Sequence, residues 1–141
     1  MKSDWADYKF DWADYLSIAE EILRLGQAID GHDTAYVRSS LSRAYYSVFC
    51  IARNMKRLDN YRPTEDAEEY KSVHRVVLDA YEQSPKDFDH DVFEHLHWLK
   101  AWRHKADYRE HTFIKRSFAE DGIKRAKECL EILLREYGDN Y

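Results

Sequence analysis

The stretch that decides the fold is Ser40-Leu-Ser-Arg-Ala-Tyr-Tyr-Ser-Val-Phe-Cys-Ile-Ala-Arg-Asn54. Its apolar residues recur every three or four positions, which is the spacing of one face of an α-helix. Val37 and Met55 extend this face on either side. Because Asp33 and Thr34 are both good N-cap residues, the pattern predicts a helix of about five to six turns that begins after them. The plainest interpretation is a central packing helix.

Helical periodicity continues on both sides of this segment. Only four glycines and two prolines interrupt the 141 residues, which favours helices over strands with their frequent turns. Further helices are predicted over about 11–29, 65–81, 89–105 and 118–137, with a less regular stretch over 107–116. The fold class is therefore all-α, an up-and-down bundle of four long helices plus a short fifth.

The chain has the usual size of one domain. We divide it into an N-terminal extension (1–10), a helical domain (11–137) and a tail (138–141). Residues 4–8 and 11–15 both read Asp-Trp-Ala-Asp-Tyr. A local duplication is favoured over a partner-binding Trp/Tyr stripe, because chain termini are often loosely tied. On the first predicted helix, the expected apolar face consists of Trp12, Tyr15, Ile18, Ile22, Leu25 and Ile29.

The two cysteines indicate a reducing compartment. Cys50 and Cys129 both fall on apolar-periodic stretches, without a Cys-Xaa-Xaa-Cys pattern, and are expected to be buried free thiols. No window is long and apolar enough for a membrane span, and the acidic, aromatic N-terminus does not resemble a signal peptide. We therefore expect a cytoplasmic protein.

One segment is basic in an otherwise acidic chain. The net charge of −5 argues against a protein that coats polyanions broadly. Between residues 95 and 116, however, six Lys/Arg stand against two acidic residues, and four histidines accompany them. This segment is where a phosphate could be held. The candidate binding residues are Lys100, Lys105, Asp107, Arg109, Arg43 and Tyr46.

The run from Arg38 to Arg53 contains Ser-Arg-Ala-Tyr-Tyr followed by small, apolar and aromatic residues, and it resembles the HEPN superfamily. Other pieces come in that family's order: Trp-Xaa-Xaa-Tyr-Leu-Xaa-Xaa-Ala at 12–19, a single histidine at position 74, and Arg-His-Lys-Ala-Asp-Tyr at 103–108. The resemblance covers roughly residues 11–136. It implies a HEPN-like helical bundle of the toxin–antitoxin or defence type.

Many HEPN members carry an arginine, a polar residue and, a few positions later, a histidine, and these members are metal-independent ribonucleases that act across a homodimer interface. The resemblance places Arg103 and His104 at the first two positions, and Tyr108 where many active relatives have histidine. Histidine can move the proton of a ribose 2′-hydroxyl while arginine holds the phosphate, whereas tyrosine is a poor base at neutral pH. His104 or His111 could substitute. The candidate catalytic residues are Arg103, His104, Tyr108 and His111.

Two other interpretations of this motif stay open. Arg103 and Asp107 stand four residues apart, so they could form a structural ion pair at the helix end with Tyr108 packed beneath it. Some HEPN toxins are silenced by a minimal nucleotidyltransferase that attaches AMP to a tyrosine near this motif, and the resemblance points to Tyr108 for such a modification.

The sequence favours no metal and no cofactor. His90, Glu94 and His97 share one helical face, and Glu94-Xaa-Xaa-His97 resembles half of a di-iron pattern, but the chain has no second Glu-Xaa-Xaa-His. Solvated surface histidines are expected. Three hypotheses remain: a homodimeric ribonuclease-like toxin or defence protein, a non-catalytic module that binds a nucleotide, RNA or a nucleotidyltransferase, and a purely structural oligomerisation bundle.

Overall fold

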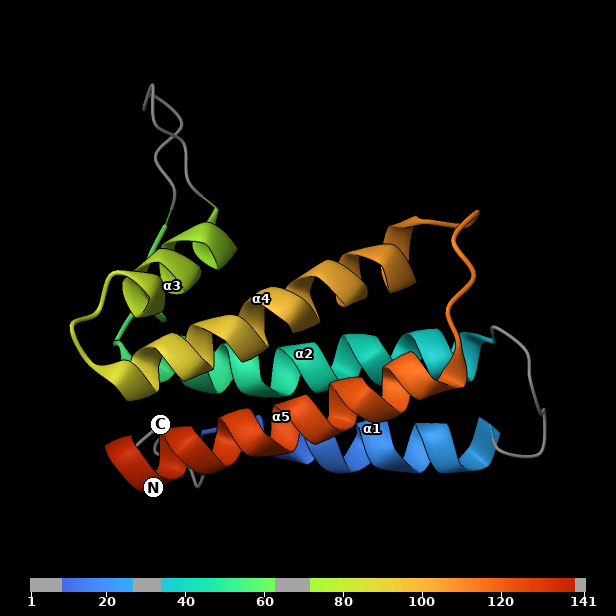
Figure 1. The fold of residues 1–141 in the computed structure, drawn as a ribbon. Helices are drawn as coiled ribbons and strands as arrows, with labels where there is room; N and C mark the ends of the chain where they lie inside the picture. Colours follow the sequence, from blue (N-terminus) through green and yellow to red (C-terminus); the bar gives the residue numbers. More distant parts are fainter. Residues whose placement is uncertain (1–8, 27–33, 63–71, 139–141) are drawn as a thin grey trace, which may run out of the picture.

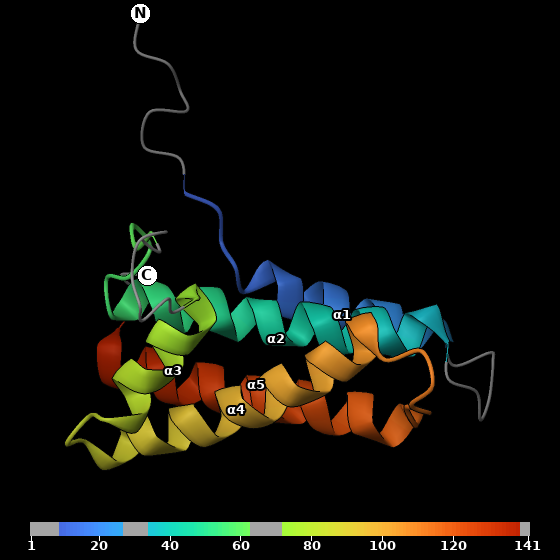
Figure 2. The same cartoon turned by 90° about the horizontal axis from the view of Figure 1, so that it is seen from above.

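The computed structural model describes residues 9–26, 34–62 and 72–138, and within these ranges it contains five α-helices and no strand. The helices are α1 (Asp14–Leu25), α2 (Ala35–Met55), α3 (Val73–Glu82), α4 (Asp87–Tyr108) and α5 (Arg116–Tyr137). The helices α1, α2, α4 and α5 run alternately up and down, and the shorter α3 packs against α4 (Figures 1 and 2). The predicted all-α bundle is confirmed.

Several expectations fall partly outside the described residues. These are the first copy of the five-residue repeat at 4–8, the end of the first predicted helix beyond Gly26, and the predicted start of the third helix before Ser72. Within the described ranges, α4 continues to Tyr108, three residues further than predicted. The candidate motif from Arg103 to Tyr108 is therefore entirely helical.

Local signals set the helix boundaries. At the start of α2, the Thr34 hydroxyl accepts a hydrogen bond from the Val37 amide at 3.3 Å, as its N-cap character predicts. At the start of α3, Ser72 accepts from the Arg75 amide in the same way. After α2, Arg57 adopts a left-handed conformation with a φ of 57°, and the Leu58 amide donates to the Arg53 carbonyl at 3.0 Å. These bonds form a Schellman motif in which an arginine occupies the position that glycine prefers.

Helix α2 is the centre of the core, as predicted. It contacts α1, α3, α4 and α5. Every residue from Leu41 to Ala52 is buried except Ser42, Arg43 and Tyr46. Cys50 of α2 and Cys129 of α5 are both buried and free, as expected. No helix in the described ranges has an apolar stretch long enough to cross a membrane.

The face of α1 was predicted wrongly. Leu16, Ala19 and Leu23 face the core, whereas Ile18 and Leu25 of the expected face are 47% and 53% exposed. Both sets of residues have helical spacing, so periodicity alone does not choose between them. Packing against α2 decides which of the two faces is buried. The buried Ser40 hydroxyl of α2 donates a hydrogen bond to the Ala19 carbonyl at 3.0 Å, and this close approach requires a small side chain on α1.

A buried carboxylate ties together the end of the bundle away from the α4 C-terminus. Asp89 of α4 has no exposed surface. It accepts hydrogen bonds from Lys56 (2.8 Å), Ser84 (2.6 Å) and Tyr137 (2.8 Å). Lys56 follows α2, and Tyr137 is the last residue of α5. The ends of three helices are therefore joined through one side chain, which the sequence analysis did not identify.

Candidate functional site

A groove of about 520 Å³ lies between α3 and α4, and it collects most of the basic residues that the sequence singled out. We call it the α3–α4 groove. From α4 and its C-cap it is lined by Phe93, His97, Lys100, Ala101, Arg103, His104, Lys105 and Arg109. From α3 it is lined by Arg75, Leu78, Asp79 and Glu82.

The groove is strongly cationic for a chain of net charge −5. Five Lys/Arg and two histidines line it, against two acidic residues. Burial, together with the charges of Arg75 and Arg103, lowers the pKa of Lys100, although Asp79 opposes this shift. Neither Lys100 nor Arg109 forms an ion pair with another described residue, so these two charges remain available to an anion. The Lys105 Nζ lies 4.1 Å from the centre of the Trp102 ring.

Arg103 occupies the inner wall of the groove. It is only 7% exposed, and its guanidinium lies over the rings of Tyr45 and Tyr46 at 5.1 and 5.4 Å. One terminal nitrogen stands 3.8 Å from an Asp107 carboxylate oxygen, which confirms the predicted ion pair. The buried Nε has no hydrogen-bond partner among the described residues. The rings and Asp107 thus hold a buried cation that still has an unused donor.

A histidine–tyrosine pair lies beneath Arg103. The Tyr45 hydroxyl and the His74 Nδ1 are 2.6 Å apart, and the His74 ring stacks on Phe49 at 4.4 Å. Burial, helped by the charges of Arg103 and Lys100, lowers the pKa of His74 to about 4, and burial raises the pKa of Tyr45. At neutral pH the imidazole is therefore uncharged and the phenol keeps its proton, so the two are joined by a hydrogen bond between neutral groups.

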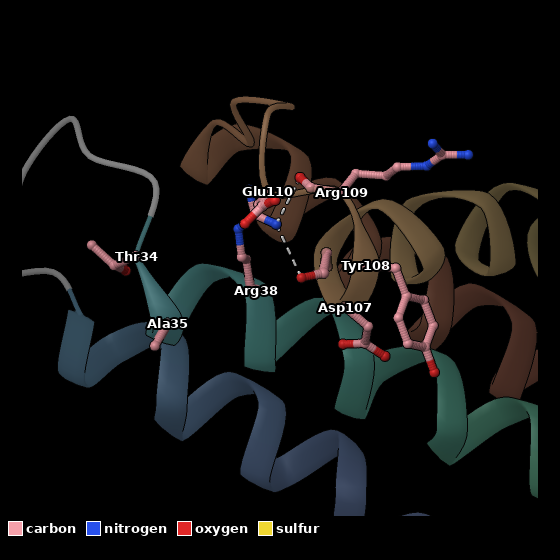
Figure 3. A pocket seen from close by; sticks show the side chains of 8 residues that line it. Thr34, Ala35, Arg38, Asp107, Tyr108, Arg109 and Glu110 are labelled. Atoms are coloured by element: carbon pink, nitrogen blue, oxygen red, sulfur yellow. Dashed lines mark hydrogen bonds between the residues drawn. The ribbon is translucent and has the colours of Figure 1, made fainter.

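A second hollow, of about 770 Å³, opens beside the C-terminal end of α4 (Figure 3). Arg38 of α2 forms part of its wall and donates to the carbonyls of Lys105, Ala106 and Arg109 at 3.1–3.2 Å. It also donates to the Thr112 carbonyl at 2.7 Å. The carbonyls at a helix end normally lack partners, so Arg38 caps α4 from another helix. Arg109 lines both this hollow and the groove.

The structure brings most of the predicted residues to these two neighbouring hollows. Lys100, Arg103, His104, Lys105 and Arg109 line the groove, and Asp107, Tyr108 and Arg109 line the hollow at the end of α4. Tyr46 lies under the Arg103 guanidinium.

Three expectations about individual residues are corrected. Tyr108 is 66% exposed, so it is not packed under the Arg103–Asp107 pair as a buried residue would be, although its ring centre lies 6.0 Å from the Arg103 guanidinium. His111 lies beyond the end of α4, lines neither hollow, and stands 3.7 Å from Glu110 with its side chain almost fully exposed. Arg43 is turned toward α1, where its guanidinium lies 5.0 Å from the Tyr15 ring.

Sequence reasoning missed several residues of the site. Tyr45 and His74 meet beneath Arg103 only because α3 folds back on α2. Arg75 of α3 lines the groove itself. His97 was considered as a metal ligand, but it lines the groove instead. The His90 Nε2 contacts the Ser84 carbonyl at 2.6 Å. Within the described ranges, no group of three His, Cys, Asp or Glu side chains is arranged to hold a metal ion.

Comparison with known proteins adds no relative: no family model, no curated protein and no solved structure matches the chain.

Proposed function

We propose that this chain is a cytoplasmic HEPN-type protein of a toxin–antitoxin or defence system, and that its α3–α4 groove binds the phosphates of RNA. One observation carries the binding function: five Lys/Arg line a single groove of a chain whose net charge is −5. The Ser-Arg-Ala-Tyr-Tyr segment supports the family. Ala44 and Tyr45 of this segment are buried in the scaffold, and the rings of Tyr45 and Tyr46 support Arg103 of α4.

The groove offers two kinds of cation. Lys100 and Arg109 make no ion pair with a described residue, so they can approach phosphates and release the counterions around them. Lys105 can add a third contact by moving its ammonium from the Trp102 ring to a phosphate. Arg103 is held in place by tyrosine rings and by Asp107. A fixed guanidinium suits the recognition of one phosphate in a defined orientation, since its planar donors can engage two oxygens at once.

Metal-independent RNA cleavage is the second candidate, and it is favoured by the presence of His97 and His104 in the same groove as Arg103. One histidine would remove the ribose 2′-hydroxyl proton, and the 2′-oxygen would attack phosphorus. The P–O5′ bond would break, and the other histidine, in its protonated form, would give its proton to the leaving 5′-oxygen. The products would be a 2′,3′-cyclic phosphate and a 5′-hydroxyl. Against this candidate, Tyr108 occupies the position of the expected histidine and is exposed.

Binding is tested by fluorescence anisotropy with a labelled single-stranded RNA at several salt concentrations. Lys100→Ala should weaken binding and reduce the slope of log K against log salt by about one, as for one lost phosphate contact. Lys124→Ala is the matched control, because Lys124 lies on α5 outside the groove. Equal affinities for the two variants would contradict the proposal.

Cleavage is tested with the same RNA on a denaturing gel. Because His104 is exposed on α4, His104→Ala should leave the fold intact and abolish cleavage if His104 is the acid or base. Arg103→Ala should abolish cleavage as well. RNA that is bound in a salt-dependent way but stays uncut identifies the non-catalytic module.

The remaining proposals concern partners. A homodimer would bring two α4 helices and their grooves together, and light scattering with size-exclusion chromatography measures its mass. The exposed Tyr108 ring is accessible to a nucleotidyltransferase. Incubation with such an enzyme and ATP should add one AMP to the wild type and none to Tyr108→Phe, as mass spectrometry would show.

A further inference from the structure

The α3–α4 groove has an apolar part that phosphate binding does not use. Leu78, Phe93 and Ala101 line it together with His97. The rings of Phe93 and His97 stack, with centroids 5.5 Å apart and an interplanar angle of 30°. Phe93 packs against the core while His97 is exposed. The pair is therefore an anchored aromatic surface that opens into a cationic groove.

The position of the cations along α4 relates this surface to the phosphate site. Lys100 follows His97 by three residues, about 4.5 Å along the helix axis, and Lys105 follows by eight, about 12 Å. Both lysines line the same groove. A ligand on the aromatic pair can therefore have one negative group at Lys100 and another toward Lys105.

We propose that Phe93 and His97 form a subsite for an unpaired nucleobase, so that the groove takes single-stranded RNA with a base stacked on this pair and the adjoining phosphate at Lys100. This inference rests on the proposed RNA binding. Aromatic rings beside a row of cations are the combination by which proteins hold single strands, because every base has a face that can stack. A duplex keeps its bases paired and stacked inside, so it could use only the cations.

The test separates the base from the phosphate. Anisotropy compares two labelled strands of about eight nucleotides, one an oligoadenylate and the other an abasic ribose-phosphate chain of equal length. His97→Ala and Phe93→Leu should each weaken oligoadenylate binding roughly 5- to 150-fold, the range for one lost stacking contact, and leave abasic binding within about twofold. Lys100→Ala should weaken the binding of both strands.

The controls address folding and the choice of aromatic residue. His97 is exposed on a helix, where alanine is well tolerated. Phe93→Leu keeps apolar volume at a partly buried position, and its circular dichroism spectrum should match that of the wild type. Phe113→Ala removes an aromatic ring that is 58% exposed and lies outside the groove, so it should bind both strands as wild type does.

Two outcomes distinguish the two proposals. If oligoadenylate and abasic strands bind equally and His97→Ala changes neither, the base subsite is refuted while phosphate binding stands. If neither strand binds, or if the affinity changes neither with the salt concentration nor with Lys100→Ala, the proposed RNA-binding function itself is refuted. Tighter binding of a duplex than of the single strand would also overturn the base subsite.

Discussion

Replacing Asp89 by asparagine should cost about 3 kcal/mol of the free energy of unfolding. The side chain is fully buried and pairs with Lys56 at 2.8 Å. Removing one partner of a buried pair costs about 3–5 kcal/mol. The lower end applies because the Lys56 side chain remains 23% exposed and asparagine can still accept from Tyr137. Asp87→Asn, at an exposed position in the first turn of the same helix, is the matched control.

The pH dependence of this difference is a second check. Burial opposes ionisation of Asp89, but hydrogen bonds from Lys56, Ser84 and Tyr137 outweigh it, so the pKa of Asp89 lies below its usual value. A carboxyl whose pKa falls on folding stabilises the protein fully above the unfolded value, about 3.9, and loses this contribution as the pH drops through the folded value.

Urea unfolding, followed by circular dichroism at pH 7 and at several lower pH values, measures both effects. The gap between wild type and Asp89→Asn should be constant from about pH 7 to 5 and narrow below about pH 4. A gap under about 1 kcal/mol at pH 7, or one that does not narrow in acid, would refute the role given to this ion pair.

Three further variants test local features of the fold. Arg57→Gly should raise the free energy of unfolding by about 0.5–1 kcal/mol, because it relieves a left-handed arginine; a lower melting temperature would contradict this. Gly122→Ala should lower the free energy of unfolding by about 1–3 kcal/mol, since a Cβ there would lie 2.6 Å from Leu41 Cδ2. An unchanged urea midpoint would show that the Leu41 side chain can move aside without loss of stability. The pKa of His74 falls to about 4 on folding, so its contribution to the free energy of unfolding is complete above about pH 6.5 and is lost as the pH falls toward 4. His74→Gln should therefore make the free energy of unfolding depend less on pH between about 6.5 and 4. The same pH dependence in wild type and variant would argue against a buried neutral imidazole.

The sequence predicted correctly those features of the fold that depend on residues within a single helix. The N-cap threonine and the apolar spacing predicted α2 almost to the residue, because capping and periodicity act within one helix. Lys100 and Arg103, both predicted as site residues from the basic segment, line the same groove. The charge imbalance between residues 95 and 116 correctly indicated where the cations gather.

What the sequence could not supply depends on contacts between distant segments. The sequence around Asp89 does not show that Lys56 and Tyr137 will contact it. An aspartate in the first turn of a helix is normally interpreted as a solvent-exposed charge that stabilises the helix N-terminus. The bond between Tyr45 and His74 joins residues 29 positions apart. The face of α1 was mistaken for a similar reason, because two apolar stripes competed and only α2 decided between them.

The Arg38 cap has a consequence for how the protein opens. A helix end usually frays, and its last amides exchange their hydrogens readily with solvent. Here the final carbonyls of α4 are bonded to a side chain of the central helix, 67 or more residues earlier in the chain. The last turn of α4 should therefore belong to the same cooperative unit as α2 and exchange only when that unit unfolds. The wall that carries His104 and Lys105 would then keep its shape before any ligand arrives.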